Sequence, residues 1–165
     1  MTRSDPPDAG PSASRRPTLS LKGRALRYLA AREHSRVELT RKLAPHAESP
    51  EQVSQVLDEL EEKGWLSAQR FAESMLHRKA ARYGTARLKA ELAQHQLPAE
   101  VASEATQTLR DTEFERAHAL WVRRFGTPPE TPEDKARQMR FLLGRGFASD
   151  VVRRVVRGDG LVTDA

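Results

Sequence analysis

The five histidines are the residues whose chemistry could serve a metal site or an acid–base site. They are His34, His46, His77, His95 and His118. None stands at a metal-binding spacing from a second histidine or from a pair of carboxylates. The chain contains no cysteine, which excludes a thiolate zinc site, a disulfide framework and a cysteine nucleophile. We therefore predict no metal site and expect each histidine to lie at the surface or at its boundary.

Nucleotide chemistry and carboxylate catalysis also lack their usual residue patterns. The chain has no phosphate-binding loop of the GxxxxGKS/T type, and Gly144 and Gly146 fall in a predicted turn between two helices. The acidic residues of 58–62 crowd the solvent side of one predicted helix, where like charges stay solvated and do not form an acid–base pair. We predict no catalytic residue and no cofactor-binding residue, and therefore no enzymatic activity.

Basic residues are concentrated on particular predicted helices. The formal net charge is +5, with 28 Lys and Arg against 23 Asp and Glu. Residues 22–42 and 70–89 are rich in Lys and Arg, whereas 48–62 is acidic. Such basic surfaces attract phosphates or an acidic protein surface over long range. We predict that exposed basic residues of the two basic regions bind the partner as a group: Arg32, Arg36, Arg41, Lys42, Arg78, Lys79, Arg82, Arg87 and Lys89.

Apolar periodicity predicts the helices that must position these residues. From Leu19 onward, apolar residues recur three and four positions apart, which is typical of helices with one buried face. Ser35 with Glu38 three residues later matches a capping box, and Ser49 before Pro50 matches another helix start. Alternating runs of β-branched residues do not occur. The predicted fold class is all-α.

The helical pattern repeats along the chain. Pairs of large apolar residues four positions apart recur at intervals of about fifty residues, namely Leu39/Leu43, Leu88/Leu92 and Met139/Leu143. We predict three tandem three-helix repeats that form an elongated, curved array, with units at residues 19–66, 67–110 and 111–158. Residues 1–18, with four prolines among small polar residues, and residues 159–165 are expected to be disordered tails.

Composition favours several small cores over one large core. Hydrophobic residues make up 38% of the chain and aromatic residues only 5%. Tyr28, Phe71, Trp65 and Trp121 fall on or beside apolar stripes, so we predict that they lie in these cores. Gly64 is expected to end a helix, with Trp65 and Leu66 folding back to supply the apolar contact that commonly follows a glycine cap.

A winged helix-turn-helix domain is the main alternative interpretation of residues 35–66. It would require two wing strands directly after Leu66, yet residues 67–83 have a helical stripe that includes Phe71 and Met75. The missing wing weakens this alternative. A helix-turn-helix-like DNA-binding regulator and a helical scaffold for another partner stay open as hypotheses.

The run from Arg24 to Leu43 resembles the opening of RecX proteins, whose first two helices have a similar spacing of Ala, aromatic-Leu, Arg, Ser-Arg and Glu-Leu. The resemblance continues through Val56-Leu-Asp-Glu-Leu60, Gly64-Trp-Leu66, Arg70-Phe-Ala72, Tyr83-Gly84 and Arg87-Leu-Lys-Ala-Glu-Leu92. Residues 20–110 match well, and the last fifty or so match in outline. The chain departs at Ala68-Gln69, where the family usually has an acidic residue, and at Gln96-Leu97, where it has Gly-Ile.

The resemblance implies a regulator that lodges in the groove of the RecA–DNA filament and inhibits its ATPase, strand-exchange and coprotease activities. It places the protein in recombinational DNA repair and the SOS response. Direct binding to single- or double-stranded DNA is expected to be weak and salt-dependent, and the protein is expected to be a monomer. Residues 1–20 have no apolar run typical of a secretory signal, and no later stretch is long enough to cross a membrane. We therefore expect a cytoplasmic protein without a membrane partner.

Overall fold

The computed structural model describes residues 17–160, and within them the fold is entirely helical. The α-helices are α1 (Leu21–Ala31), α2 (Arg36–Leu43), α3 (Pro50–Glu62), α4 (Ala68–Lys79), α5 (Thr85–Ala93), α6 (Ala99–Asp111), α7 (Glu113–Arg124), α8 (Pro132–Gly144) and α9 (Ser149–Arg157). A short 3-10 helix, Ala44–His46, follows α2. The predicted tails lie outside the described residues, except for residues 17, 18, 159 and 160.

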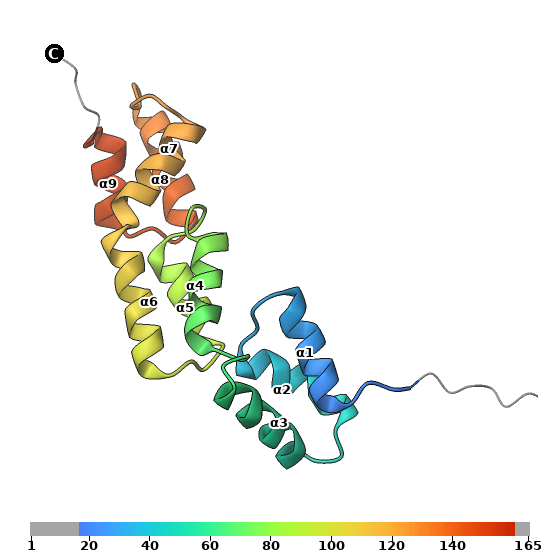
Figure 1. Ribbon diagram of the computed structural model, residues 1–165. Helices are drawn as coiled ribbons and strands as arrows, with labels where there is room; N and C mark the ends of the chain where they lie inside the picture. Colours follow the sequence, from blue (N-terminus) through green and yellow to red (C-terminus); the bar gives the residue numbers. More distant parts are fainter. Residues whose placement is uncertain (1–16, 161–165) are drawn as a thin grey trace, which may run out of the picture.

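The helices form three groups that lie in a row (Figure 1). We call α1–α3 the first unit, α4–α6 the second unit and α7–α9 the third unit. Each unit has a hydrophobic core of its own. The array is elongated and bends between α3 and α4 (Figure 1). The predicted all-α fold of tandem three-helix repeats is therefore confirmed.

Side-chain caps fix where several helices begin. The Ser35 hydroxyl accepts a hydrogen bond from the Glu38 N–H, and the Glu38 side chain accepts one from the Ser35 N–H, which confirms the predicted capping box. Ser49 caps α3 by accepting from the Gln52 N–H, with Pro50 at the first helical position. Because α4 begins directly after Ser67, the wing strands of the helix-turn-helix alternative are absent from this part of the chain.

The end of α3 shows why one aromatic prediction is wrong. Gly64 has a φ of +75°, and the N–H groups of Trp65 and Leu66 both donate to the Leu60 carbonyl. This reversal buries Leu66 but leaves Trp65 46% exposed. Trp65 is therefore not a core residue, because Leu66 alone supplies the apolar contact. Of the other predicted core aromatics, Phe71 and Trp121 are buried and Tyr28 is half-buried.

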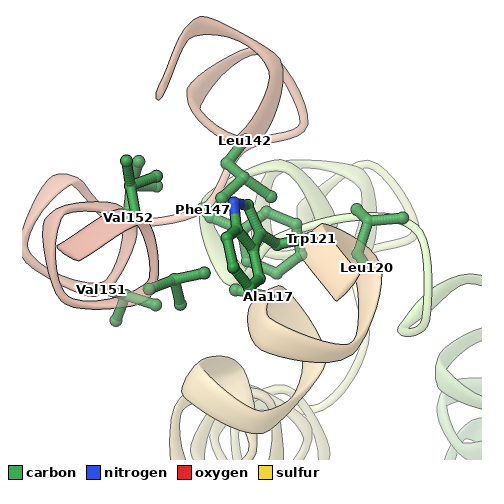
Figure 2. Close-up of a cluster of buried hydrophobic side chains, with 9 residues drawn as sticks. Ala117, Leu120, Trp121, Leu142, Phe147, Val151 and Val152 are labelled. Carbon is green, nitrogen blue, oxygen red and sulfur yellow. The ribbon is translucent and has the colours of Figure 1, made fainter. Parts of the chain in front are cut away.

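Trp121 lies at the centre of the third core, as Figure 2 shows. Its indole N–H donates to the Gln138 side-chain carbonyl at 2.8 Å. A buried indole N–H without a partner would be costly, so α8 must turn Gln138 inward. Leu142, one helical turn later, then shares the buried face.

This orientation of α8 contradicts the predicted pair Met139/Leu143. Leu143 is 41% exposed and Met139 is only partly buried, whereas Gln138 and Leu142 are both buried. The buried face is shifted by one residue because Trp121 requires a polar partner. Gln138 is polar, so the apolar spacing of the sequence gives no sign that it is buried. The corresponding pairs Leu39/Leu43 and Leu88/Leu92 are buried as predicted.

The second and third units meet through a close backbone approach. The Gly84 N–H donates to the Arg145 carbonyl at 2.8 Å. A Cβ on Gly84 would lie 2.2 Å from backbone atoms of Gly146 and Phe147, and one on Gly146 would lie 2.6 Å from the Cβ of Arg87. Both positions therefore require glycine, because any side chain would push the units apart.

One buried carboxylate caps two helices at this second joint, which comprises Gly84, Glu113, Arg116 and Gly146. Glu113 Oε1 accepts hydrogen bonds from the Thr85 N–H at 3.3 Å and the Ala148 N–H at 3.1 Å. These N–H groups lie at the start of α5 and α9, whose own N-cap residues provide no side-chain hydrogen bond. A negative charge at two positive helix ends stabilises both helices and holds the units together.

Arg116 completes the second joint by binding carbonyl groups. Its guanidinium donates to the carbonyls of Ala80 and Tyr83 after α4, and to the Leu109 carbonyl near the end of α6. Burial lowers the pKa of Arg116, although the nearby Glu113 charge opposes that shift. The joint thus places an anion at helix starts and a cation at helix ends, as the helix dipoles favour.

Replacement of Glu113 by Ala is expected to reduce the free energy of unfolding by about 2 to 4 kcal/mol, because two buried N–H groups lose their charged acceptor. Glu113→Gln, which keeps an acceptor oxygen, should have a smaller effect. Urea denaturation followed by circular dichroism measures the change. Glu115→Ala, at an exposed position of the same helix, is the control. Equal effects of Glu113→Ala and Glu115→Ala would contradict the shared-cap interpretation.

Two glycine substitutions are expected to act in opposite directions. Gly84→Ala should destabilise the protein by about 1 to 3 kcal/mol, because the new methyl group meets backbone atoms that cannot yield without separating the units. Gly144→Ala, at the end of α8 with no atom within 4 Å of the new Cβ, should stabilise it by up to about 1 kcal/mol. Thermal melting of both variants checks the pair. A Gly84→Ala variant as stable as the parent chain would refute the close-approach argument.

Candidate partner-binding surface

Three of the nine predicted partner-binding residues form ion pairs inside the protein. Arg32 binds Glu38 at 2.5 Å. Arg36 binds Asp58 at 2.7 Å and Glu61 at 3.2 Å, and Lys79 binds Glu91. Their charges are therefore partly neutralised and help to position the units' own helices.

The Arg32–Glu38 pair also changes the pKa of the Glu38 carboxyl group. Burial raises the pKa of Glu38, but the hydrogen bond and positive charge of Arg32 outweigh burial and hold that pKa below its usual range. Glu38 thus stays ionised while its side chain completes the capping box of α2. Arg32 is consequently a structural residue as well as a predicted contact.

Lys42 lies beside a buried histidine. His34 is only 2% exposed, so the prediction that every histidine lies at the surface or its boundary is wrong at this position. Both ring nitrogens have partners: Nδ1 lies 3.0 Å from the Arg32 carbonyl oxygen, and Nε2 lies 3.0 Å from the Lys42 ammonium. These partners fit a neutral ring that donates from Nδ1 and accepts at Nε2. The Lys42 ammonium also lies 4.7 Å from the centre of the Tyr28 ring.

The other five predicted residues have no carboxylate partner within residues 17–160; they are Arg41, Arg78, Arg82, Arg87 and Lys89. All five are exposed. Arg82 and Arg87 are brought together by Tyr83, whose ring centre lies 5.7 Å and 4.0 Å from their Cζ atoms. Arg41 lies on the first unit, apart from the other four, which lie on or next to α4 and α5. The second unit therefore presents most of the uncompensated positive charge of the predicted set.

The first and second units meet at a polar joint, the first joint, which comprises Glu33, Ser35, Arg70 and His95. His95 Nδ1 lies 2.7 Å from the Ser35 hydroxyl oxygen, and Arg70 pairs with Glu33 at 2.9 Å. The His95 ring packs in a tilted arrangement against Phe71 of the second core, with 4.6 Å between the ring centres and 52° between the ring planes. Ser35 already accepts from the Glu38 N–H, so its hydroxyl proton is available to a neutral His95 ring.

None of the nine predicted partner-binding residues lies in the third unit, but the structure brings Arg145 of that unit beside the predicted set. Arg145 has its Cζ 5.7 Å from the ring centre of Tyr83, the ring that Arg82 and Arg87 also contact. The only sign in the sequence was the frequency of arginine between residues 123 and 157. That frequency could not identify Arg145, because its position depends on the Gly84–Gly146 approach.

Two further observations concern residues 17–160 only. No group of three or more His, Asp or Glu side chains is placed to hold a metal ion. None of the helices there has both the length and the apolar character needed to span a bilayer.

Three family models match successive parts of the chain. The first three-helix domain of RecX matches residues 22–60, the second matches residues 69–105, and the third matches residues 111–156. A regulatory protein RecX from Leptothrix cholodnii is 57% identical over 145 residues, which cover 88% of this chain and 92% of that protein. This chain belongs to the RecX family. A regulatory protein RecX from Ralstonia pickettii is 56% identical over 90% of this chain and 94% of its own length.

Solved RecX structures share the fold. The crystal structure of RecX from Lactobacillus salivarius has a TM-score of 0.70 at 18% identity and covers 86% of this chain and 96% of that chain. A second crystal structure, of a regulatory protein RecX, has a TM-score of 0.67 at 21% identity and covers 82% of this chain and 70% of that chain. The arrangement of the three units is therefore retained at low sequence identity.

We expect the stability of the protein to fall as the pH drops below about 6.5, the ordinary value for histidine. Burial lowers the pKa of both His34 and His95, and nearby Arg32 adds to this shift. The unfolded chain, in which these pKa values return to normal, then binds more protons than the folded chain. The stability that these two neutral histidines contribute is fully present above pH 6.5. It is lost as the pH falls towards their lowered pKa values in the folded chain.

Urea denaturation at about pH 7.5 and about pH 5.5 measures this pH dependence. The double variant His34→Gln, His95→Gln should show a smaller loss between the two pH values than the parent chain. The matched control, His46→Gln with His77→Gln, changes two exposed histidines and should keep the parent's pH dependence. A parent chain that is equally stable at both pH values would contradict the expectation.

Proposed function

We propose that this protein binds the RecA recombinase filament and inhibits its ATPase, strand-exchange and coprotease activities. It would thereby modulate recombinational DNA repair and the SOS response in the cytoplasm, acting as a monomer. The observation that supports this most directly is the match of all three RecX domain models between residues 22 and 156. The proposed effect requires no chemistry by this chain, since binding across filament subunits can itself alter ATP turnover.

The shape of the molecule supports this role. Three units with separate cores form an elongated array (Figure 1). An array of this kind can contact several neighbouring subunits of a helical filament at once. Simultaneous contacts raise the overall affinity far above that of any single contact, provided that their spacing matches.

Charge supports the choice of contact residues. We propose the nine basic residues as a group, with the main contribution from Arg41, Arg78, Arg82, Arg87 and Lys89, which are exposed and have no carboxylate partner in the described part of the chain. Exposed, unpaired cations keep their full long-range field, which speeds encounter with acidic protein or with phosphate. Arg32, Arg36 and Lys79 would contribute less, because binding a partner competes with their existing ion pairs. Weak direct binding to DNA is part of the same proposal.

The test is the single-stranded-DNA-dependent ATPase rate of RecA, titrated with the full chain. Dose-dependent inhibition is expected. A charge-reversed variant of the second unit, with Arg78, Arg82, Arg87 and Lys89 changed to Glu, should require at least about tenfold more protein for half-inhibition. The control reverses Arg27 and Arg110, two exposed arginines outside the proposed set, and should inhibit like the parent chain. Helicity and melting temperature establish that each variant folds.

Two outcomes would contradict the proposal. The first is an unchanged ATPase rate at a several-fold excess of this protein over RecA. The second is inhibition that disappears when more single-stranded DNA is added, because that pattern indicates sequestration of DNA and not binding to the filament. Either result would favour a DNA-binding regulator or a scaffold for another partner.

A further inference from the structure

A row of arginines and aromatic rings crosses the second joint. Its members come from the connection between α4 and α5, from α5, from the end of α7 and the residue after it, and from α8 and the residue after it. We call it the arginine–aromatic ladder, and it consists of Arg82, Tyr83, Arg87, Arg124, Phe125, Arg137, Phe141 and Arg145. Only Arg82 and Arg87 belong to the predicted partner-binding set.

Tyr83 is the ring at the second-unit end of the ladder. The Cζ of Arg87 lies 4.0 Å from its centre, close enough for direct stacking. The Cζ atoms of Arg82 and Arg145 each lie 5.7 Å from the same centre. Arg145 therefore links this ring to the third unit.

Phe141 and Phe125 continue the row. Arg145 lies 5.1 Å from the Phe141 ring centre and Arg124 lies 5.7 Å from it. Arg124 also lies 5.5 Å from the Phe125 ring, as Arg137 does at 5.8 Å. The two phenyl rings pack edge to face at 5.5 Å. Neighbouring members are thus in contact from one unit to the next.

The ladder arginines keep their hydrogen-bonding capacity. Within residues 17–160, the side chains of Arg82, Arg87, Arg124 and Arg145 form no ion pair and donate no hydrogen bond, and only Arg137 has a carboxylate partner, Asp134 at 3.2 Å. The contacts with the aromatic rings use none of the guanidinium N–H groups. Those groups remain available for bidentate binding of an anion.

The second joint makes the ladder a rigid surface. The Gly84 N–H binds the Arg145 carbonyl, so the backbone of Arg145 is fixed next to Tyr83. Glu113 and its two backbone donors hold α5 and α9 in place around the same joint. The backbone segments that carry the arginines of the two units are consequently held next to one another before any partner binds, which reduces the ordering cost of binding.

The chemistry of the ladder favours a polyanion over an apolar protein surface. Guanidinium groups cover the aromatic faces, and the rings of Tyr83, Phe125 and Phe141 are half-buried. Exposed N–H donors are left, without the apolar centre that protein–protein interfaces usually bury. A row of exposed guanidinium groups can bind successive anions along a chain, such as phosphates. We propose that the ladder binds the phosphodiester backbone of a nucleic-acid strand.

This inference rests on the direct DNA binding included in the proposed function and locates it mainly on residues of the third unit. Backbone phosphates are recognised without base readout, so the site should show little sequence preference. Arg124 and Arg145 are the residues that test it, because both lie outside the nine residues assigned to RecA binding. Their side chains also make no hydrogen bond that maintains the fold in residues 17–160.

The experiment measures binding of a fluorescein-labelled oligothymidylate to the full chain by anisotropy, between about 50 and 200 mM salt. The double variant Arg124→Gln, Arg145→Gln should bind about tenfold more weakly at the lower salt concentration. The plot of log K against log salt should become less steep by about 1.4, or about 0.7 for each lost phosphate contact. The control, Arg27→Gln with Arg110→Gln, removes two exposed arginines outside the ladder and should change affinity less than about twofold.

A second double variant controls for effects on folding. Arg124→Lys with Arg145→Lys keeps both charges but removes the planar, bidentate groups. It should keep the parent's salt slope and lose less affinity than the glutamine pair. Melting temperatures of all variants are compared with the parent chain. Ladder and control variants that bind the oligothymidylate equally well would overturn the proposal.

Competition identifies the anion. An excess of poly-glutamate should displace the oligothymidylate poorly, because its carboxylates lie on flexible side chains that must be ordered when they bind. If poly-glutamate displaces the labelled oligothymidylate as well as unlabelled oligothymidylate does, at equal concentrations of negative charge, the nucleic-acid assignment is overturned in favour of an acidic protein partner.

The RecA ATPase assay separates this inference from the proposed function. If the parent chain inhibits RecA but the glutamine pair binds oligothymidylate normally, the ladder assignment is wrong and the proposed function stands. If the glutamine pair loses oligothymidylate binding while the parent chain fails to inhibit RecA, the ladder stands and the proposed function is wrong.

Discussion

The Glu113 carboxylate is the interaction on which the arrangement of the second and third units depends. Each unit has only about forty to fifty residues, so its core is small, and separate small cores give the units little reason to hold one orientation. Glu113 supplies that reason because one oxygen accepts from the starts of α5 and α9 together. Arg116 does the complementary work at the carbonyl ends of the second unit. Removing either group would leave buried backbone N–H or C=O groups without hydrogen-bond partners, so these polar contacts help to hold the joint together.

The first joint is built differently, and the difference bears on how the protein binds. Its ion pair, Arg70–Glu33, involves side chains that are 45% and 28% exposed, so solvent screens much of the attraction. His95 adds a hydrogen bond to Ser35 whose form depends on the charge of the ring. The joint between the second and third units is therefore held by buried polar groups, whereas the first unit is attached through more exposed ones. In the proposed complex this allows the first unit to adjust to the filament while the other two keep their geometry.

Positive charge serves two purposes in this chain. Some cations stabilise the units internally, as Arg36 does by joining α2 to the acidic side of α3. Others have no carboxylate partner in residues 17–160 and gather around aromatic rings near the second joint, as Arg87 and Arg145 do around Tyr83. Counting basic residues along the sequence cannot separate these groups, since Arg36 and Arg87 both occupy helices with a similar composition. The distinction depends on which acidic residues fold back within reach, and this is why the predicted contact set mixes structural and available cations.

The sequence by itself determined the local structure. Ser35, Ser49 and Gly64 fix helix starts and ends through hydrogen bonds that span only a few residues, and apolar spacing of three and four residues places the buried faces of most helices. The repeat, the all-α class and the RecX resemblance follow from the same short-range patterns.

Tertiary structure alone decided that α8 buries Gln138 and Leu142 in place of Met139 and Leu143, that His34 is buried, that Trp65 is exposed, and that Arg145 lies beside Tyr83. In three of these cases the deciding partner is brought in by the folding of another segment: the Trp121 indole for Gln138, the Lys42 ammonium for His34 and the Gly84–Gly146 contact for Arg145. Trp65 is exposed because the reversal at Gly64 turns the neighbouring Leu66 into the core of the first unit. Patterns read along one helix contain no information about a partner that only packing brings within hydrogen-bond or van der Waals distance.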